Sequence, residues 1–362
     1  MRGQTAEQAS MLTLISPDSL IPKDHPVRAI KRLADTALKA LSSDFDMMYS
    51  RLGRASIPPE RLLKAQVLIA LFSVRSERQF CEQLGYNLMF RWFLDMELDE
   101  KVFDATVFTQ NRDRLIEHDV ARKFFEAVVG QAHSAGLVSK EHFSTDGTLF
   151  EAWASLKSFK RKDGKSKGAD DDDKGNPSVN FHGERRTNDT HASTTDPDAK
   201  LMRKSDGTGA ELSYAAHGLM ENRNGLLVDL EVTPSVGVTE RDATLDMLLR
   251  RENPLRHITV GGDKGYDTKL FVGMARLLNA TPHVAANTKR RGGSAIDGRT
   301  MRHAGYEKSQ RLRKRIEEIW GWLKTVGGLR KTRFKGTPRV RLHAVFAATA
   351  YNLLRMSKLM PG

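Results

Sequence analysis

Cysteine is almost absent from this 362-residue sequence, which contains only Cys81. A lone cysteine cannot form an internal disulfide, and no cluster of cysteine and histidine has the spacing of a zinc site. Long apolar runs are also missing. None approaches the ~18 residues of a membrane span, and the N-terminus lacks the apolar region of a signal peptide. These absences predict a cytoplasmic protein with a reduced thiol and no membrane partner.

Positive charge, in contrast, is in excess. Lysine and arginine number 58 against 45 aspartate and glutamate, which gives a formal net charge of +13. A solvated surface explains part of this excess, but a polyanionic partner explains more of it, and nucleic acid is the commonest one. Hydrophobic residues make up 39% of the chain, enough for a packed core, and the length suggests about two domains.

The first part of the chain, residues 1–137, has the apolar spacing of helices. Pro58 and Pro59 open one helix, and Ser76 caps a short one that Gly85 ends. Two short helices joined by a tight turn, with arginines nearby, fit a helix-turn-helix that binds a DNA end. A plain helical bundle fits the same pattern equally well, and both interpretations stay open.

The second part, residues 138–358, alternates strands with helices and predicts an α/β domain around one sheet. Strands are expected at His142–Thr148, Leu212–Met220, Leu226–Thr233, Ile258–Val260 and Thr281–Ala286. Residues at about 155–209 interrupt this pattern, because large apolar residues almost vanish there. That composition predicts a polar, partly disordered insertion.

Two of the expected strands end in an aspartate. Asp263 follows Ile258–Val260 and two glycines, and Asp146 stands in Thr-Asp-Gly-Thr at the end of the first strand. A carboxylate at the C-terminal edge of a central strand is well placed to hold a cation. The alternative for each is an aspartate that only caps a turn or a helix. Asp267 is expected to cap the next helix, whose apolar positions are Leu270, Phe271, Met274 and Leu277.

A strongly patterned helix is expected from Gln310 to about Val326. Its apolar stripe, which faces the core, consists of Leu312, Ile316, Ile319 and Leu323. A second stripe beside it consists of Gln310, Arg313, Glu317 and Lys324. At 100° per residue Glu317 borders the apolar stripe, whereas Glu318 points away from it. The second stripe is either a solvated edge with ion pairs or one side of a functional site.

Taken together, the three acids have a family resemblance. Asp146 in Thr-Asp-Gly-Thr, Asp263 in Gly-Asp-Lys-Gly-Tyr-Asp and Glu317 in Ile-Glu-Glu-Ile-Trp-Gly-Trp-Leu-Lys resemble the acidic triad of bacterial insertion-sequence transposases. These enzymes form the DDE class, and the chain resembles their insertion-sequence-five group. The resemblance covers nearly the whole chain, including Phe103-Asp104-Ala105-Thr106 in the helical part.

The most specific part of the resemblance is the last helix. The family signature there is Tyr-x2-Arg-x3-Glu-x6-Lys, and it is matched at Arg313, Glu317 and Lys324. Gln310 stands where the tyrosine belongs, and Tyr306, one turn earlier, is the alternative.

The resemblance implies an RNase H-like mixed sheet with flanking helices, preceded by an all-α N-terminal domain. It implies that Asp146, Asp263 and Glu317 hold two Mg²⁺ ions, or Mn²⁺ in their place, with Asp146 bridging both. Hard cations take oxygen ligands, and a metal pair stabilises the entering and leaving oxygens of phosphoryl transfer. The expected reaction is cleavage of DNA strands at the element's ends, followed by strand transfer.

The implied partners are the terminal inverted repeats of the element and its target DNA, bound by a homodimer or larger assembly in the bacterial nucleoid. Arg313 and Lys324 are expected to grip phosphates. Further DNA contacts are expected from Arg290, Arg291, Arg330, Lys331 and Arg333. Two alternatives stay open: an inactive copy that only binds DNA, and a basic structural protein without a catalytic site.

Overall fold

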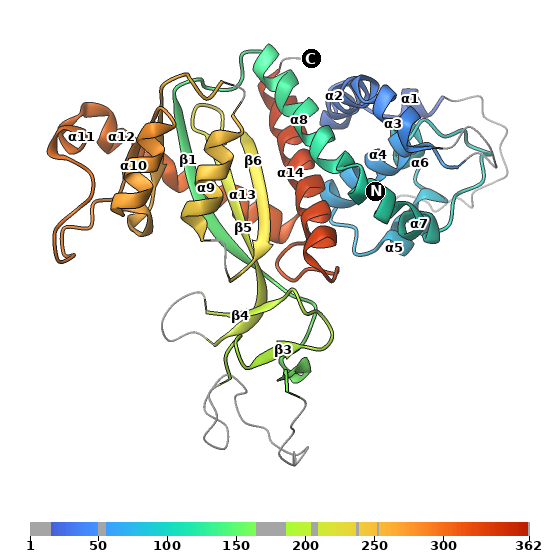
Figure 1. Cartoon of the computed structure of the whole chain (residues 1–362). Helices are drawn as coiled ribbons and strands as arrows, with labels where there is room; N and C mark the ends of the chain where they lie inside the picture. The colour runs from blue at the N-terminus through green and yellow to red at the C-terminus, as the bar shows by residue number, and fades with distance from the viewer. Residues whose placement is uncertain are drawn as a thin grey trace, which may run out of the picture.

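A six-stranded mixed sheet with β1 at its centre organises the protein (Figure 1). In this computed structural model the described residues are 16–49, 56–163, 186–203, 209–236, 239–251 and 253–360. In order across the sheet, the strands are β4 (Lys200–Met202), β5 (Glu211–Glu221), β1 (His142–Glu151), β7 (Ile258–Gly262) and β8 (Ala280–Val284), with β6 (Leu227–Pro234) paired to β5. β1, β7 and β8 are parallel, whereas β5 is antiparallel to its three neighbours. The predicted α/β class with a mixed sheet is confirmed.

Helices precede the sheet and then cover it. The first group comprises α1 (Pro17–Leu20), α2 (Pro26–Ala40), α3 (Ser42–Met48), α4 (Pro59–Leu71), α5 (Glu77–Leu84), α6 (Leu88–Phe93), α7 (Thr106–Glu117) and α8 (Val120–Ser134). The second comprises α9 (Glu240–Leu249), α10 (Lys269–Leu277), α11 (Gly298–Arg302), α12 (Ala304–Leu312), α13 (Ile316–Thr325) and α14 (Thr337–Leu359). Short 3₁₀ turns are η1 (Leu156–Ser158), η2 (Lys264–Tyr266) and η3 (Arg313–Arg315). No helix in these described ranges is long and apolar enough to cross a membrane.

β1 sends alternate side chains to two differently covered faces. On one face the Thr145 hydroxyl lies 2.6 Å from the Thr244 hydroxyl of α9. On the other face Phe150 packs edge-on against Trp320 of α13, whose indole donates a hydrogen bond to Asp146. α9 and α13 therefore cover opposite faces of the sheet, and Asp146 belongs to the α13 face.

The long helix α14 connects the N-terminal helices with the sheet. It packs against α2, α4 and α8 on one side and against β6 on the other (Figure 1). Its buried residues belong to one apolar core that runs from the N-terminal helices to the sheet, and a smaller core lies under α9 and α10. A hydroxyl contact also crosses this interface, where Ser73 donates to the Val326 carbonyl at 3.0 Å.

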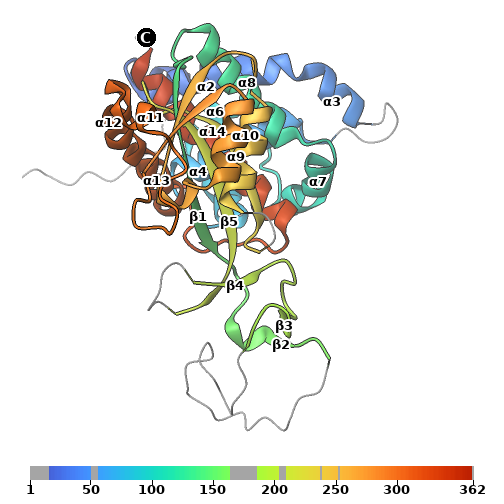
Figure 2. The same cartoon turned by 60° about the vertical axis from the view of Figure 1, so that its left-hand side comes forward.

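The described part of the polar insertion at about 155–209 contains short strands. β2 (Phe159–Arg161) and β3 (His191–Ser193) form a small sheet that projects from the body in both views (Figures 1 and 2), and β4 joins the main sheet. Buried Asp196 accepts hydrogen bonds from the Tyr214 hydroxyl and the Gly336 amide. Polar side chains thus tie this segment to the body where apolar ones are missing. Residues 164–185 and 204–208 of the insertion lie outside the described residues.

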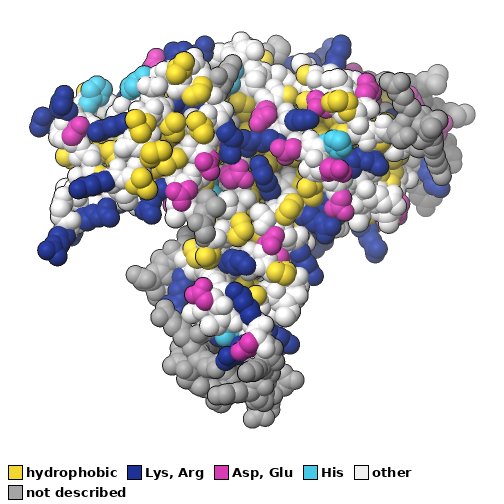
Figure 3. Space-filling view, in the orientation of Figure 1, with side chains coloured by type: hydrophobic (Ala, Val, Ile, Leu, Met, Phe, Trp, Pro, Cys, Tyr) yellow, Lys and Arg dark blue, Asp and Glu magenta, His cyan; other side chains and the backbone are white. Residues whose placement is uncertain are grey.

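Helix α10 buries a different face from the expected one. Phe271, Val272 and Ala275 are buried, whereas Leu270 and Leu277 are 72% and 77% exposed. On the face drawn in Figure 3, exposed apolar side chains gather over α9 and α10. The helix has apolar residues on two sides, and the side with Phe271, which was expected to be apolar and is buried, packs toward α9 and β8.

The cap of α10 was also predicted wrongly. Thr268 caps the helix by accepting a hydrogen bond from the Phe271 amide. Asp267 instead accepts from the amides of Asn287 and Ala295, at 2.6 and 2.8 Å, and so holds two points of a basic, glycine-rich loop that residues 287–297 form. The Asp267 carboxylate satisfies two loop amides, whereas the start of α10 needs only the hydroxyl of Thr268 as its cap.

Candidate active site

Asp146 and Asp263 meet where the parallel pairing of β1 and β7 ends. The last paired residues are Ser144 and Gly261, and each aspartate lies two residues further along its strand. Neighbouring strands are about 4.8 Å apart, so this register brings the two carboxylates to one edge. Asp146 was predicted from the sequence to stand at the end of its strand, but β1 continues to Glu151 by pairing with β5.

Asp146 is half-buried and crowded by negative charge. Burial, followed by the charges of Asp263 and Glu317, raises the pKa of its carboxyl to about 6. Hydrogen bonds from the Gly147 amide and from the Trp320 indole, the latter at 3.2 Å, oppose this shift. Desolvation and like charge thus outweigh the two donors, which is the balance expected of a carboxylate that awaits a cation.

Glu317 reaches the same region from α13, near the start of that helix. It is exposed, and its charge acts on Asp146, whereas the charge of its neighbour Glu318 acts on Tyr351 of α14. The two glutamates are 100° apart around the helix, which is why they face different surroundings.

A fourth carboxylate, which the sequence did not reveal, belongs to the same group. Glu240 is the first residue of α9, after the capping box that Thr239 forms with Asp242. Partial desolvation, followed by the charges of Asp146 and Asp263, raises the pKa of Glu240 to about 7. Only the capping pattern was visible in the sequence, and it locates a helix start without saying what the helix faces.

The donors suit a hard divalent cation, but they are not yet gathered around one point. In the described ranges no three acidic, histidine or cysteine side chains come close enough to hold one ion. The carboxylate of Asp263 instead accepts a hydrogen bond from the Gly265 amide at 2.7 Å. Oxygen-only donors in a crowded, half-buried group fit Mg²⁺ or Mn²⁺ in type, and Asp263 has a second carboxylate oxygen that the Gly265 amide does not use.

The stripe of Gln310, Arg313, Glu317 and Lys324 in the last helix is divided by η3. Before this turn, the Gln310 amide donates to the His283 carbonyl of β8, and the Arg313 side chain donates to Gln310 at 3.2 Å. After it, the Lys324 ammonium donates to the Thr148 hydroxyl of β1 at 2.6 Å. The hydroxyl of Tyr306, the alternative tyrosine, donates to the Val284 carbonyl at the end of β8.

The expected DNA-binding residues fall into two groups. Arg291 is exposed on the glycine-rich loop, where Arg290 donates to the Asp267 carbonyl. Of the later tract Arg330 is exposed, Lys331 pairs with Glu151, and half-buried Arg333 donates to the carbonyls of Val74 and Arg75. Arg333 thus connects the later tract with the N-terminal helices. The guanidinium nitrogen that binds these carbonyls is then not available for a DNA phosphate.

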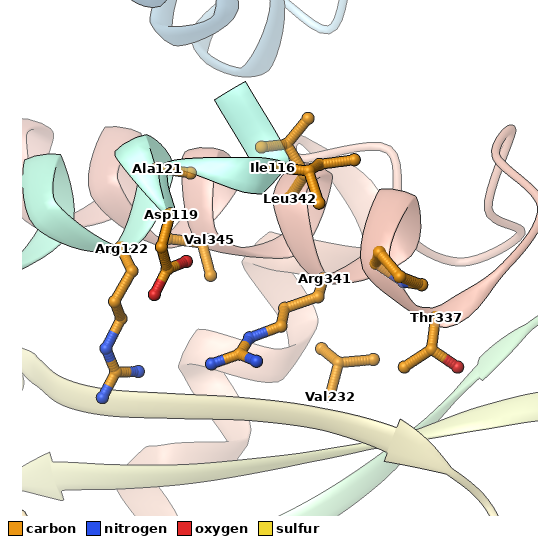
Figure 4. A pocket seen from close by; sticks show the side chains of 10 residues that line it. Ile116, Asp119, Ala121, Arg122, Val232, Thr337, Arg341, Leu342 and Val345 are labelled. Carbon is orange, nitrogen blue, oxygen red and sulfur yellow. The ribbon is translucent and has the colours of Figure 1, made fainter. Parts of the chain in front are cut away.

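Two cavities lie away from the carboxylates. One, of about 310 Å³, is between α8, α14 and β6, and the arginines that enter it, Arg122 and Arg341, pair with Asp229 and Glu231 (Figure 4). The other, of about 560 Å³, lies beside the opposite end of β1 and β7. Neither of these two cavities is lined by Asp146 or Asp263.

Two family models match the chain in succession. Residues 15–114 match the model described as "Transposase domain (DUF772)", and residues 187–353 match the model described as "Transposase DDE domain". The chain is a DNA transposase of the DDE class. The predicted class, RNase H-like fold and function are thereby confirmed, and an enzyme of this class cleaves DNA. The insertion-sequence-five group stays a prediction, and so do the roles of Asp146, Asp263 and Glu317 and of the DNA-binding residues; Asp146 also precedes the matched segment.

Solved structures of other transposases are similar to this transposase at low identity. A piggyBac transposase synaptic complex with hairpin DNA is 10% identical, with a TM-score of 0.40, over 92% of this chain and 75% of that one. A Mos1 strand transfer complex is 10% identical, with a TM-score of 0.21, over 89% and 82% of the two chains. No curated protein sequence matches the transposase.

Proposed function

We propose that this transposase cleaves DNA at the ends of an insertion sequence and joins the freed 3′-hydroxyl to target DNA, using Asp146, Asp263 and Glu317. The observation that carries the proposal is the charge crowding at Asp146, which the other two acids intensify. Like charges gathered without a neutralising side chain destabilise the folded protein. A cation bound during function is the physical reason to keep such an arrangement.

The cation we propose is Mg²⁺, with Mn²⁺ as a substitute, because carboxylate oxygens are the ligands that these ions prefer. When bound, two such ions supply an activated water and neutralise charge on the entering and leaving oxygens. The Trp320 indole holds Asp146 in one orientation, and its ring fills the space beside Gly218 of β5. That support keeps the carboxylate aimed at the sheet edge while DNA and cations exchange.

The basic side chains of the last helix bind the DNA backbone in this proposal. Lys324 exchanges its Thr148 partner for a phosphate oxygen, and Arg313 offers the guanidinium nitrogens that Gln310 does not use. Arg290, Arg291 and Arg330 extend the contact, and residues 1–137 bind the terminal repeats. A homodimer or larger assembly brings two element ends and the target together.

Glu317 and Glu318 provide a matched test, since they are adjacent, exposed and identical in type. Glu317→Gln should reduce single-turnover cleavage of DNA that carries the element's ends by more than about 100-fold, because even partners one shell removed from a metal are worth 10- to 100-fold. Glu318→Gln should cleave like the unaltered protein. Both variants should melt at the same temperature and bind the DNA with unchanged affinity.

Three results would count against the proposal. Loss of cleavage in Glu318→Gln with retention in Glu317→Gln would place the wrong acid in the site. Full cleavage by both variants would remove Glu317 from the chemistry. An unaltered protein that binds the ends in Mg²⁺ and never cleaves them would favour an inactive, DNA-binding copy.

A further inference from the structure

Glu240 approaches Asp146 from the opposite face of the sheet. Asp146 belongs to the α13 face, and the next residue, Gly147, belongs to the face that α9 covers. A β-carbon placed on Gly147 would lie 2.5 Å from a carboxylate oxygen of Glu240 and 2.9 Å from its γ-carbon. The end of the Glu240 side chain therefore occupies the space that the missing Gly147 side chain leaves.

This position is costly unless something cationic joins it. The Glu240 carboxylate has no ion pair or hydrogen bond within the described ranges, while its charge adds to those of Asp146 and Asp263. The guanidinium of its neighbour Arg241 donates to the Gly265 carbonyl, in the turn that follows Asp263. Arg241 thus fastens α9 to the turn after Asp263, and Glu240, the residue before it, brings a carboxylate to the same turn.

A buried hydroxyl beside this carboxylate points to a missing partner. Tyr266 is 1% exposed, and its hydroxyl makes no hydrogen bond of good geometry among the described residues, although the hydroxyls of Thr145 and Thr244 lie close enough to act on it. The charges of Glu240 and Asp146 both act on this hydroxyl. An unsatisfied buried donor in a native fold usually signals an absent water or ion, or a group that moves when one binds.

We propose that Glu240 is a fourth carboxylate of the divalent-cation site, reaching the ions from the α9 face through the notch at Gly147. The proposal rests on the proposed function, because it needs the cation site at Asp146 and Asp263. It predicts that ions are held from both faces of the sheet, by Glu317 on one side and Glu240 on the other. Asp146 and Asp263 lie at the edge between them.

Binding of Tb³⁺, a luminescent cation that also takes carboxylate ligands, tests this without any need for DNA. Trp320 is hydrogen-bonded to Asp146, so its excitation should sensitise an ion at the site. Glu240→Gln should weaken Tb³⁺ binding to the full chain by about tenfold or more. Asp246→Asn, which removes an exposed charge from the same helix, should leave the affinity unchanged.

Gly147→Ala is a second test that alters no carboxylate. The three atoms nearest to its methyl group would all belong to the flexible side chain of Glu240, so the protein should fold while that side chain is pushed away. Tb³⁺ affinity should fall as it does in Glu240→Gln. The same substitution made in a Glu240→Ala background should have no further effect.

Asp146→Asn separates the two levels of inference. If it abolishes sensitised Tb³⁺ binding while Glu240→Gln and Gly147→Ala bind within twofold of the unaltered protein, the role of Glu240 is refuted and the proposed site stands. If Asp146→Asn also binds normally, the cation site itself is wrong. A melting temperature in EDTA that falls in Glu240→Gln, with Tb³⁺ affinity unchanged, would show that Glu240 only supports the helix start.

Discussion

Replacing Asp146 by asparagine should make the cation-free protein more stable, contrary to the usual effect of altering a half-buried residue. The pKa of Asp146 is about 6 in the folded protein, against an ordinary value of 3.8. The folded state therefore holds this proton more tightly than the unfolded chain does. Stability falls as the pH rises from about 4 through 6, and the loss is complete above both values.

The magnitude follows from the pKa difference. Ionisation of Asp146 costs the folded state about 3 kcal/mol at pH 7.5 and under about 1 kcal/mol at pH 4. Asparagine removes this cost and keeps an oxygen that accepts from Trp320. For a chain of this length, 3 kcal/mol corresponds to a rise of about 4 °C in melting temperature.

The assay is thermal or urea unfolding of the full chain in EDTA at several pH values. The advantage of Asp146→Asn should grow between pH 4 and pH 7. Saturating Mg²⁺ should then reverse the order, since ligand at 1,000 times its dissociation constant adds about 4.1 kcal/mol to the unaltered protein alone, which exceeds the advantage of about 3 kcal/mol. An advantage that does not change with pH, or a variant that is less stable in EDTA at pH 7.5, would refute the charge-crowding argument.

Three further predictions concern the cation, the DNA and the domain contact. Excess EDTA should abolish strand cleavage and leave most DNA binding, and full cleavage in EDTA would exclude the cation mechanism. Log affinity for DNA should fall against log salt concentration with a slope of about −5 if about six phosphates are neutralised, and a slope near zero would exclude phosphate-dominated binding. Arg333→Ala should lower unfolding free energy by about 1–3 kcal/mol, because it strands two carbonyls of the N-terminal helices, whereas exposed Arg330→Ala should not.

The sequence was informative where a local pattern decides the outcome. The strands expected at Leu212–Met220 and Leu226–Thr233 flank Asn222-Arg223-Asn224-Gly225, a sequence typical of a hairpin turn, and β5 and β6 form that hairpin with Gly225 at a positive φ of 74°. The strand before Asp263 was likewise visible from its β-branched run and its glycines. In each case the information lies within a few residues of the feature, so neighbouring elements cannot overrule it.

Features set by distant neighbours were missed. The residues around Asp146 do not reveal that β1 pairs with β7 only as far as Ser144 but with β5 as far as Glu151. Because of this difference, Asp146 lies in the middle of β1 and yet at an unpaired edge on the β7 side. Glu240 was missed for the same reason. Its approach to Asp146 depends on the absence of a side chain at Gly147, about 90 residues away in sequence.

In the last helix the motif residues are present, but their arrangement around the helix differs from the predicted one. The prediction placed Gln310, Arg313, Glu317 and Lys324 on one stripe by assuming 100° per residue throughout. Residues of the 3₁₀ turn η3 advance by about 120° each, so its three residues rotate the second half of the helix by about 60° relative to the first. The first half of the stripe therefore lies against β7 and β8, and the second half lies against β1.

The two halves of the helix contact different strands. The β-carbon of Arg313 lies 3.3 Å from where a Gly261 side chain would begin, so the first half is seated on β7 and β8. Glu317 and Lys324 then face Asp146 and Thr148 of β1. A straight α-helix seated on Gly261 would carry Glu317 away from Asp146 by that rotation. The turn thus lets one helix anchor at the strand that carries Asp263 and deliver its acid to the strand that carries Asp146.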